Sequence, residues 1–216
     1  MKQDLLKQNI VFFVNNANST GIYYFYVKNG KPIYNRNINI IYLSPTYGST
    51  YVDIISGKDA QQYFAFTLRK CPTRNIYYTI HFSVISTGSG FDFKPFAIGS
   101  EVYLASYGYL TSDRFLSFGY YHKKQDILSL SYNGNGYTIY NYEFDTNTLY
   151  KLSIYYGDDF IRISLNNDIK KIQVSKSPID CNKYIYYGIN ADMDSGDKIR
   201  IYKIILYPYV ASVSTI

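Results

Sequence analysis

Hydrophobic and polar residues alternate along most of the chain. The stretch "LYKLSIYYGDDFIRISLNND", residues 149–168, contains two alternating segments separated by Gly-Asp-Asp at 157–159. A period of two is typical of a β-strand with one face in the core and one face in water, and Gly and Asp favour tight turns. The stretch therefore predicts a hairpin with one wet side. In its first strand the two faces carry Leu152, Ile154 and Tyr156 against Lys151, Ser153 and Tyr155.

Similar alternating segments recur at short intervals along the chain. Clusters of Gly, Pro, Asn, Asp and Ser separate them, and the Asn-Gly pairs of "SYNGNGYTIY" at 131–140 suit the positive φ angles of a type I′ hairpin turn. Short strands separated by turn signals about every 8–12 residues predict an antiparallel β-sandwich or barrel. The predicted strands are 9–15, 22–29, 38–43, 50–55, 62–69, 76–86, 91–98, 101–107, 114–121, 127–132, 137–144, 149–156, 160–166, 169–174, 183–189 and 198–208.

The domain organisation follows from the same pattern. No Pro-, Gly- or Ser-rich linker divides the 216 residues, so we predict one domain spanning 1–216. An N-terminal extension at 1–60 that contributes edge strands is the alternative. The expected fold class is all-β, an antiparallel β-sandwich of jelly-roll type with about 14 strands.

The composition adds an unusual aromatic content. The chain contains 28 Tyr, 13 Phe and no Trp, and its 47% of hydrophobic residues excludes a disordered chain. Tyr has a high strand propensity and offers an apolar ring with a polar tip. The wealth of Tyr, Ile and Asn and the scarcity of Glu are similar to virion and surface proteins of thermoacidophilic archaea and their viruses.

The net charge of +6 could indicate an anionic partner, but the basic residues are scattered along the chain. Nucleic-acid binding favours a clustered basic stripe, so it is not expected here. We expect no membrane span, because no stretch approaches the ~18 apolar residues that a span requires. The first residues lack the features of a secretory signal. We therefore expect a virion or extracellular location reached by another route, such as release inside a virus particle.

Four segments, in their order along the chain, resemble the concanavalin A-like or laminin-G-like jelly rolls over about 76–208. In the first of them, Phe82 and Val84 stand where that pattern has core residues, and Tyr150 stands where it often has Trp. The resemblance implies a jelly roll of a superfamily whose members bind glycans or proteins, or hydrolyse glycosides. Receptor-binding parts of toxins and viral spikes also use this fold. The segments are "IYYTIHFSVISTG", "ILSLSYNGNGYTIYNYEF", "TLYKLSIYYGDDFIRISLNNDIKKIQV" and "YIYYGINADMDSGDKIRIYKIILYP".

Catalytic residues are not expected. Retaining glycosidases need two carboxylates about 5 Å apart. Glu101 and Glu143 each lack a second Glu at the required spacing, and Asp145 is better placed to open a turn. His81 is predicted to be a polar position in a strand. Cys71 and Cys181 form either one disulfide or two buried thiols.

Two groups of residues are candidates for binding. Sugars stack on exposed aromatic rings beside amides, so we select tyrosines near Gly or Asn in predicted loops. Alternating oxygen ligands at 190–197 suggest a calcium site, although a plain acidic loop is the favoured alternative and no other cofactor is expected. The glycan candidates are Tyr107, Tyr109, Tyr132, Asn133, Asn135 and Tyr137, and the calcium candidates are Asn190, Asp192, Asp194 and Asp197.

Together these observations predict a non-enzymatic viral structural or attachment protein, such as a capsid, spike or tail component, that contacts host glycans. Its expected partners are other copies of itself, other particle proteins and a cell-surface glycan. The alternative is a free carbohydrate-binding module or the receptor-binding domain of a toxin. A glycoside hydrolase is the more distant alternative.

Overall fold

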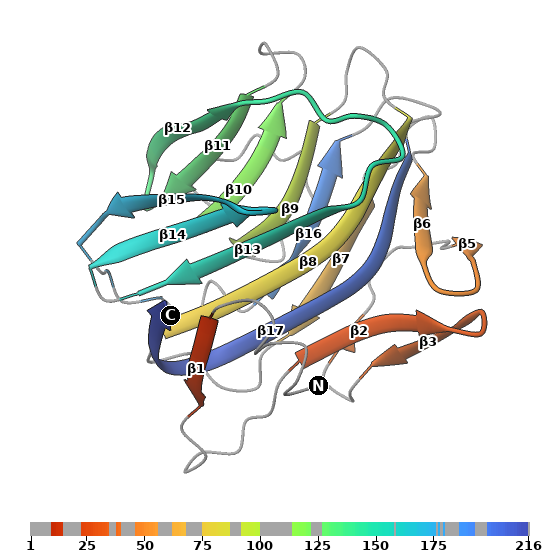
Figure 1. Cartoon of the computed structure of the whole chain (residues 1–216), viewed down its shortest axis with the longest axis horizontal. Coiled ribbons are helices and arrows are strands. Elements are labelled where there is room, and N and C mark those ends of the chain that lie inside the picture. Colours follow the sequence, from red (N-terminus) through yellow and green to blue (C-terminus); the bar gives the residue numbers. More distant parts are fainter. Residues whose placement is uncertain are drawn as a thin grey trace.

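In the computed structural model, the described residues form strands and turns (Figure 1). The described residues are 10–14, 23–34, 38–39, 46–55, 62–67, 75–86, 92–99, 114–121, 127–157, 159–175, 177, 179, 186–192 and 198–215.

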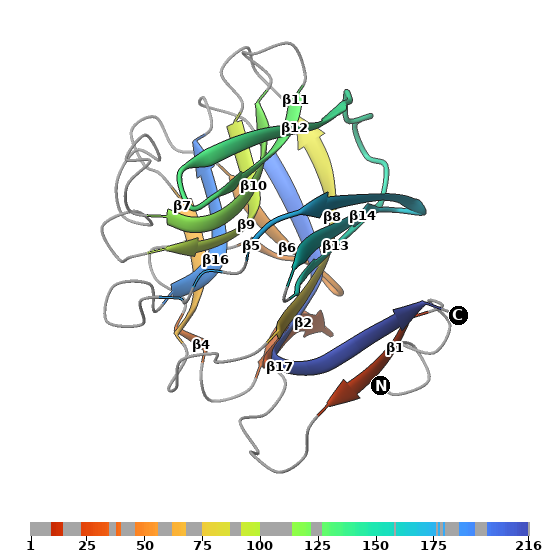
Figure 2. The same cartoon turned by 90° about the vertical axis from the view of Figure 1, so that its left-hand side faces the viewer.

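The strands form two antiparallel sheets that lie face to face as two layers (Figure 2). The ten strands of sheet A are β15 (Asp168–Gln173), β14 (Phe160–Leu165), β13 (Tyr150–Tyr156), β8 (Asn75–Ser86), β17 (Lys198–Thr215), β2 (Tyr23–Lys28), β3 (Lys31–Tyr34), β1 (Ile10–Val14), β5 (Thr46–Tyr47) and β6 (Val52–Ile55). The seven strands of sheet B are β12 (Asn135–Asn141), β11 (Ile127–Tyr132), β10 (Arg114–Tyr121), β9 (Asp92–Gly99), β16 (Tyr186–Asp192), β7 (Gln62–Thr67) and β4 (Ile38–Asn39).

The predicted antiparallel β-sandwich is confirmed, with differences in its details. The described residues form seventeen strands, more than the expected 14 or so. The pattern missed the short strands β3 and β5, because each contributes too few residues for an alternation to stand out. The predicted strand at 198–208 ends earlier than β17, which continues to Thr215. The predicted strand at 137–144 begins two residues after the start of β12. The strand predicted at 101–107 lies outside the described residues, and the single domain remains a prediction.

The core lies between the inner faces of the two sheets. Phe82 of β8 packs edge-on against Phe93 of β9, with ring centroids 5.3 Å apart. Tyr78 packs against Phe96, and its hydroxyl donates a hydrogen bond of 2.8 Å to the carbonyl of Pro95. Phe82, Val84 and Tyr150 are buried, as the resemblance implies. Large aromatic rings from both layers therefore interlock, since each buries much apolar surface.

Asn-Gly turns connect neighbouring strands as the sequence predicts. Asn133 and Gly134 have φ angles of 46° and 82° and join β11 directly to β12. The same turn chemistry, at Asn29 and Gly30, joins β2 to β3. A turn with two positive φ angles matches the twist of paired strands, and Asn and Gly adopt these angles most easily.

One prediction about sheet A is wrong. The alternation of β13 suggests that its second face is wet, yet Ser153 and Tyr155 are both only 5% exposed. Tyr155 lies in a second hydrophobic cluster with Tyr77, Ile205 and Tyr207, on the outer face of sheet A. Strands pair in register here, placing Tyr207 beside Tyr77 and Tyr77 beside Tyr155. Large side chains on neighbouring strands therefore bury one another on the outer face of sheet A, opposite the face that packs into the main core.

The long strand β17 connects most of sheet A. One of its edges pairs with β8, whereas the other pairs in turn with β6, β2 and β1. The final part of β17 and its partner β1 project to one side of the two layers (Figure 2). Strands from the first residues of the chain are thus held beside its last strand.

Candidate functional site

A groove with a volume of about 480 Å³ lies on the outer face of sheet A. Its lining residues belong to strands β2, β17 and β8 and to the turn that joins β5 to β6. The groove combines aromatic, aliphatic, hydroxyl and cationic groups, which is typical of a site for a polar organic ligand. It is lined by Tyr24, Tyr26, Val27, Thr50, His81, Tyr202, Lys203 and Ile205.

Alternation along β2 places two tyrosines in this groove. Phe25 and Val27 are buried in the core, so Tyr24 and Tyr26 point to the outer face, where both remain half-exposed. Their ring centroids lie 6.1 Å apart and their planes differ by 33°. Adjacent rings at a shallow angle form a continuous aromatic surface.

A β-bulge brings Tyr202 to the same face. Ile201 pairs with Phe82 and Lys203 pairs with His81, so Tyr202 is an extra residue in β17. The bulge shifts the alternation by one position, and both Tyr202 and Lys203 line the groove. Bulges often redirect a side chain next to a functional site.

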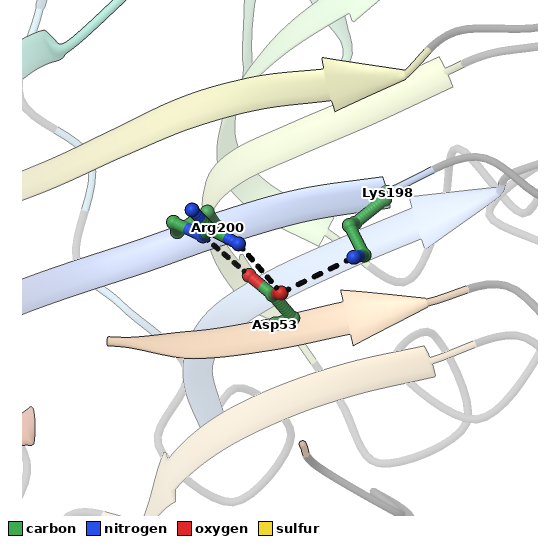
Figure 3. Close-up of polar contacts among 3 residues, drawn as sticks. All are labelled: Asp53, Lys198 and Arg200. Carbon is green, nitrogen blue, oxygen red and sulfur yellow. Dashed lines mark hydrogen bonds and ion pairs between the residues drawn. The ribbon is translucent and has the colours of Figure 1, made fainter. Parts of the chain in front are cut away.

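An ion-pair cluster joins β6 to β17 next to Tyr202 of the groove (Figure 3). Arg200 donates hydrogen bonds of 2.7 and 2.9 Å to the two carboxylate oxygens of Asp53, and the Lys198 ammonium lies 3.3 Å from Asp53 Oδ2. The guanidinium lies over the Tyr51 ring, 3.6 Å from its centroid, and Tyr51 packs edge-on against Tyr202. A bidentate pair fixes orientation as well as charge, so β6 supports Tyr202 through Tyr51.

The contacts within this cluster shift the pKa values of Asp53 and Arg200. Burial of Asp53 acts to raise its pKa, but the hydrogen bonds and charges of Arg200 and Lys198 outweigh burial and lower the pKa of Asp53. The same hydrogen bond raises the pKa of Arg200. Asp53 and Arg200 therefore form an ion pair throughout the physiological pH range.

Four side chains form one row across neighbouring strands, and three of them line the groove. Tyr26 of β2 pairs with Lys203 of β17, Lys203 with His81 of β8, and His81 with Lys151 of β13. Burial and the charges of Lys151 and Lys203 lower the pKa of His81 to about 4. His81 is therefore a neutral imidazole at pH 7, and it lies between two ammonium groups.

The hydroxyls of Tyr24, Tyr26 and Tyr202 have no hydrogen-bond partner among the described residues. They are thus available to a ligand, together with the hydroxyl of Thr50 and the imidazole of His81. Flat rings can stack on the apolar face of a pyranose, and the surrounding polar groups can bind its hydroxyls. The groove has the chemistry of a sugar-binding surface.

Four of the glycan candidates from the sequence lie elsewhere, on the β11–β12 hairpin of sheet B. Asn133 and Asn135 are exposed at its tip, and Tyr137 is half-buried against the core. The expectation that Tyr132 is exposed is wrong, because only 4% of it is exposed. Its hydroxyl donates to the carbonyl of Ser175 at 2.8 Å and accepts from the amide of Ser177 at 2.8 Å.

Other candidates fall partly or wholly outside the described residues. Tyr107, Tyr109, Cys71, Cys181, Asp194 and Asp197 lie outside them. Asn190 and Asp192 belong to the end of β16 and not to a loop, and their side chains are not described. Within the described part of the chain, no group of three or more His, Cys, Asp or Glu could hold a metal ion. The calcium site and the Tyr107–Tyr109 site remain predictions.

Solved structures with similar folds include several lectin domains. No protein-family model and no curated sequence matches the chain. The carbohydrate recognition domain of Emp47p superposes with a TM-score of 0.63 at 10% identity, over 89% of this chain and 99% of that domain. The exoplasmic/lumenal domain of VIP36, bound to Ca²⁺ and Man3GlcNAc, superposes with a TM-score of 0.51 at 13% identity. The match covers 76% of this chain and 81% of the VIP36 chain.

An enzyme shares the fold as part of a larger chain. Trypanosoma rangeli sialidase, in a covalent intermediate with 2,3-difluorosialic acid, superposes with a TM-score of 0.59 at 9% identity. The match covers 88% of this chain but only 30% of the sialidase. These likenesses confirm the fold class as a concanavalin A-like jelly roll. No helix in the described part of the chain is long and apolar enough to cross a membrane.

The sequence offered only a weak signal for the groove. Alternation in "YYFYVK" places Tyr24 and Tyr26 on one face, but similar Tyr patterns recur throughout the chain. The bulge at Tyr202 and the pairing of β2 with β17 have no local sequence signal. The residues of the site therefore come together only through strand order and register.

Proposed function

We propose that this protein is a non-catalytic carbohydrate-binding module that binds sugars in the groove on sheet A. The observation that carries the proposal is the presence of three half-buried tyrosine rings in the groove whose hydroxyls have no partner among the described residues. Stacking of a sugar ring on Tyr24, Tyr26 or Tyr202 buries apolar C–H groups against an aromatic face. Thr50 and His81 then bind hydroxyls at the rim of that ring.

The similar folds favour the same class of ligand, because the Emp47p structure is a carbohydrate recognition domain and the VIP36 domain contains bound Man3GlcNAc. The viral capsid, spike or tail role expected from the sequence gains no support from these similarities. The free module fits them better, at an extracellular or lumenal location. Fold alone assigns no activity, so the groove has to be tested directly.

The first experiment is a glycan-array screen followed by calorimetric titration with the best ligand. We expect Tyr26→Ala to weaken binding about tenfold, since a lost ring contact of ~1.4 kcal/mol changes an affinity by that factor. The folding of this variant should be unaffected, because Tyr26 is half-exposed. The matched control is Tyr137→Ala on the hairpin, which should keep the full affinity.

The same titrations distinguish the two candidate sites. If Asn133→Ala with Asn135→Ala removes binding and Tyr26→Ala does not, the sugar binds at the hairpin and the proposed groove is wrong. Intact ligand after prolonged incubation is the expected result for a module without catalysis. Shortened chains in that incubation would instead indicate a glycoside hydrolase or lyase.

Light scattering separates the module from the particle component. We expect the glycan-binding species to be a monomer in solution. A defined oligomer that binds the same glycan would favour a shell or spike protein, whose several copies would increase the avidity.

A further inference from the structure

Two lysines in and beside the groove suggest which sugars it takes. Lys203 lines the groove beside His81, and Lys151 extends the same row by one strand. Neighbouring strands lie about 4.8 Å apart, so the two lysines start from positions within about 10 Å of each other. Long flexible side chains at that spacing can converge on one ligand group.

Neither lysine has a carboxylate partner within the described part of the chain. The ion pairs there join Asp53 to Arg200 and Lys198, and Asp168 to Lys170. Both Lys151 and Lys203 are half-buried. Two like charges held close together and partly out of water are unfavourable unless an anion joins them.

The other groups that face His81 do not supply that anion. They are Tyr24 and Tyr26 on β2, Tyr202 on β17 and Thr50 in the β5–β6 turn. Thr79 and Ser83 flank His81 on the same face of its own strand, and both are uncharged hydroxyls. The described residues around His81 therefore carry positive charge or none.

Backbone contacts hold the end of this row in place. The amide of Lys151 donates a hydrogen bond of 2.9 Å to Asn166 Oδ1, and the Asn166 amide donates one of 2.7 Å to the Lys151 carbonyl. Asn166 adopts a φ angle of 53° in the turn between β14 and β15. Lys151 therefore projects from a fixed point of the sheet, which favours a built site over a fortuitous surface charge.

We propose that the groove selects acidic saccharides, with the carboxylate or sulfate of the sugar bound between Lys203 and Lys151 while the tyrosines hold its ring. This inference rests on the proposed function and adds the class of ligand. Ammonium groups form charge-assisted hydrogen bonds with such anions. His81 contributes a third polar contact, as a neutral donor at pH 7 and as a cation when it is protonated.

Protonation of His81 provides an independent signature. The two lysines and burial lower the pKa of His81 to about 4 in the free protein. A bound anion counters the charges of the lysines and so raises this pKa. Binding should then take up protons, and the affinity should rise as the pH falls from 7 to 5, where a sugar carboxylate is still ionised.

The test uses matched pairs of ligands on the full chain. The pairs are hexagalacturonate with its methyl ester, sialyllactose with lactose, and a chondroitin sulfate hexasaccharide with its desulfated form. We expect an acidic member to bind about tenfold more tightly than its neutral partner at low salt, and less so at 1 M salt. The first two pairs report a carboxylate, and the third reports a sulfate.

Variants then locate the preference. Lys203→Gln and Lys151→Gln should each reduce the ratio of the affinity for the acidic member to the affinity for the neutral one. Lys170→Gln on the edge strand β15 is the control, since it removes the same charge three strands from His81. His81→Gln should remove the rise in affinity between pH 7 and pH 5. Thermal melting of each variant checks that it is folded.

The outcomes separate the two proposals. Equal binding of acidic and neutral members, lost in Tyr26→Ala, would overturn the acidic preference and keep the sugar-binding groove. An acidic preference that survives in both lysine variants would also overturn the assignment. If no saccharide binds at all, the proposed function fails, and the preference fails with it.

Discussion

Two groups of tyrosines on the outer face of sheet A differ in their access to water. Tyr77 and Tyr207 are 1% and 2% exposed, and their ring centroids lie 5.9 Å apart. Tyr24, Tyr26 and Tyr202 lie on the same face and are half-exposed. The first group forms a second small core, whereas the second group lines a groove.

Hydrogen bonding of the hydroxyls also separates Tyr77 and Tyr155 from the tyrosines of the groove. Tyr77 donates a hydrogen bond of 3.1 Å to Ser153 Oγ, which donates to Thr79 Oγ1 at 3.2 Å, and Asn75 Nδ2 donates to the Tyr155 hydroxyl at 2.9 Å. The hydroxyls of the groove have no such partners among the described residues. The hydroxyls of Tyr77 and Tyr155 are therefore used within the fold, whereas those of the groove point to a surface where a ligand could bind them.

The largest expected effect is on stability, from Tyr77→Ala. Removing a buried aromatic ring leaves a cavity and costs about 3–5 kcal/mol. Tyr26→Ala should cost less than about 1 kcal/mol, because its ring is half-exposed. Urea unfolding followed by fluorescence measures both free energies of unfolding. Similar values for the two variants would mean that the two groups of tyrosines do not differ as described.

Asp53→Asn should have the second largest effect, about 2 kcal/mol, because it leaves Arg200 without its bidentate partner. The carboxylate of Asp53 has a lowered pKa in the folded state. Its contribution is therefore present above the ordinary pKa of 3.8 and is lost as the pH falls through the lower folded value. Unfolding curves between pH 7 and pH 2.5 should show a smaller acid loss in the variant. Equal acid loss in both proteins would contradict this role.

Removal of a single hydroxyl sharpens the comparison further. Tyr77→Phe should cost about 1 kcal/mol, since it leaves Ser153 without its donor in a dry environment. Tyr26→Phe should leave the free energy of unfolding unchanged and weaken glycan binding instead. Paired unfolding and calorimetric measurements on the two variants test this. A stability loss in Tyr26→Phe would indicate that its hydroxyl serves the fold.

The smallest expected effect concerns the pH dependence of stability at His81. Its folded pKa of about 4 lies below the ordinary value of 6.5. Between these values the unfolded chain binds a proton that the folded protein does not, so stability should fall as the pH falls from 6.5 to 4. Solvent screening of this half-exposed side chain keeps the effect small. His81→Gln should flatten the curve over this window, and an unchanged slope would show that His81 does not contribute.

Local sequence determined most of the secondary structure. The alternation in "LYKLSIYYGDDFIRISLNND" and the Asn-Gly pair at 133–134 predicted the hairpins that the structure contains. The core positions Phe82 and Val84 followed from the resemblance to the concanavalin A-like or laminin-G-like jelly rolls, and both are buried. These predictions succeed because side-chain direction in a strand and the conformation of a tight turn depend on only a few neighbouring residues.

The candidate site was decided by tertiary structure alone. Tyr132 looked available beside an Asn-Gly turn, but contacts with Tyr156, Ser175 and Ser177 bury it. Tyr26, His81 and Lys203 become neighbours because β2, β8 and β17 pair across almost the whole length of the chain. Alternation states which face of its own strand a residue occupies. The order and register of the strands decide whether that face is dry, as at Tyr77, or open to a ligand, as at Tyr26.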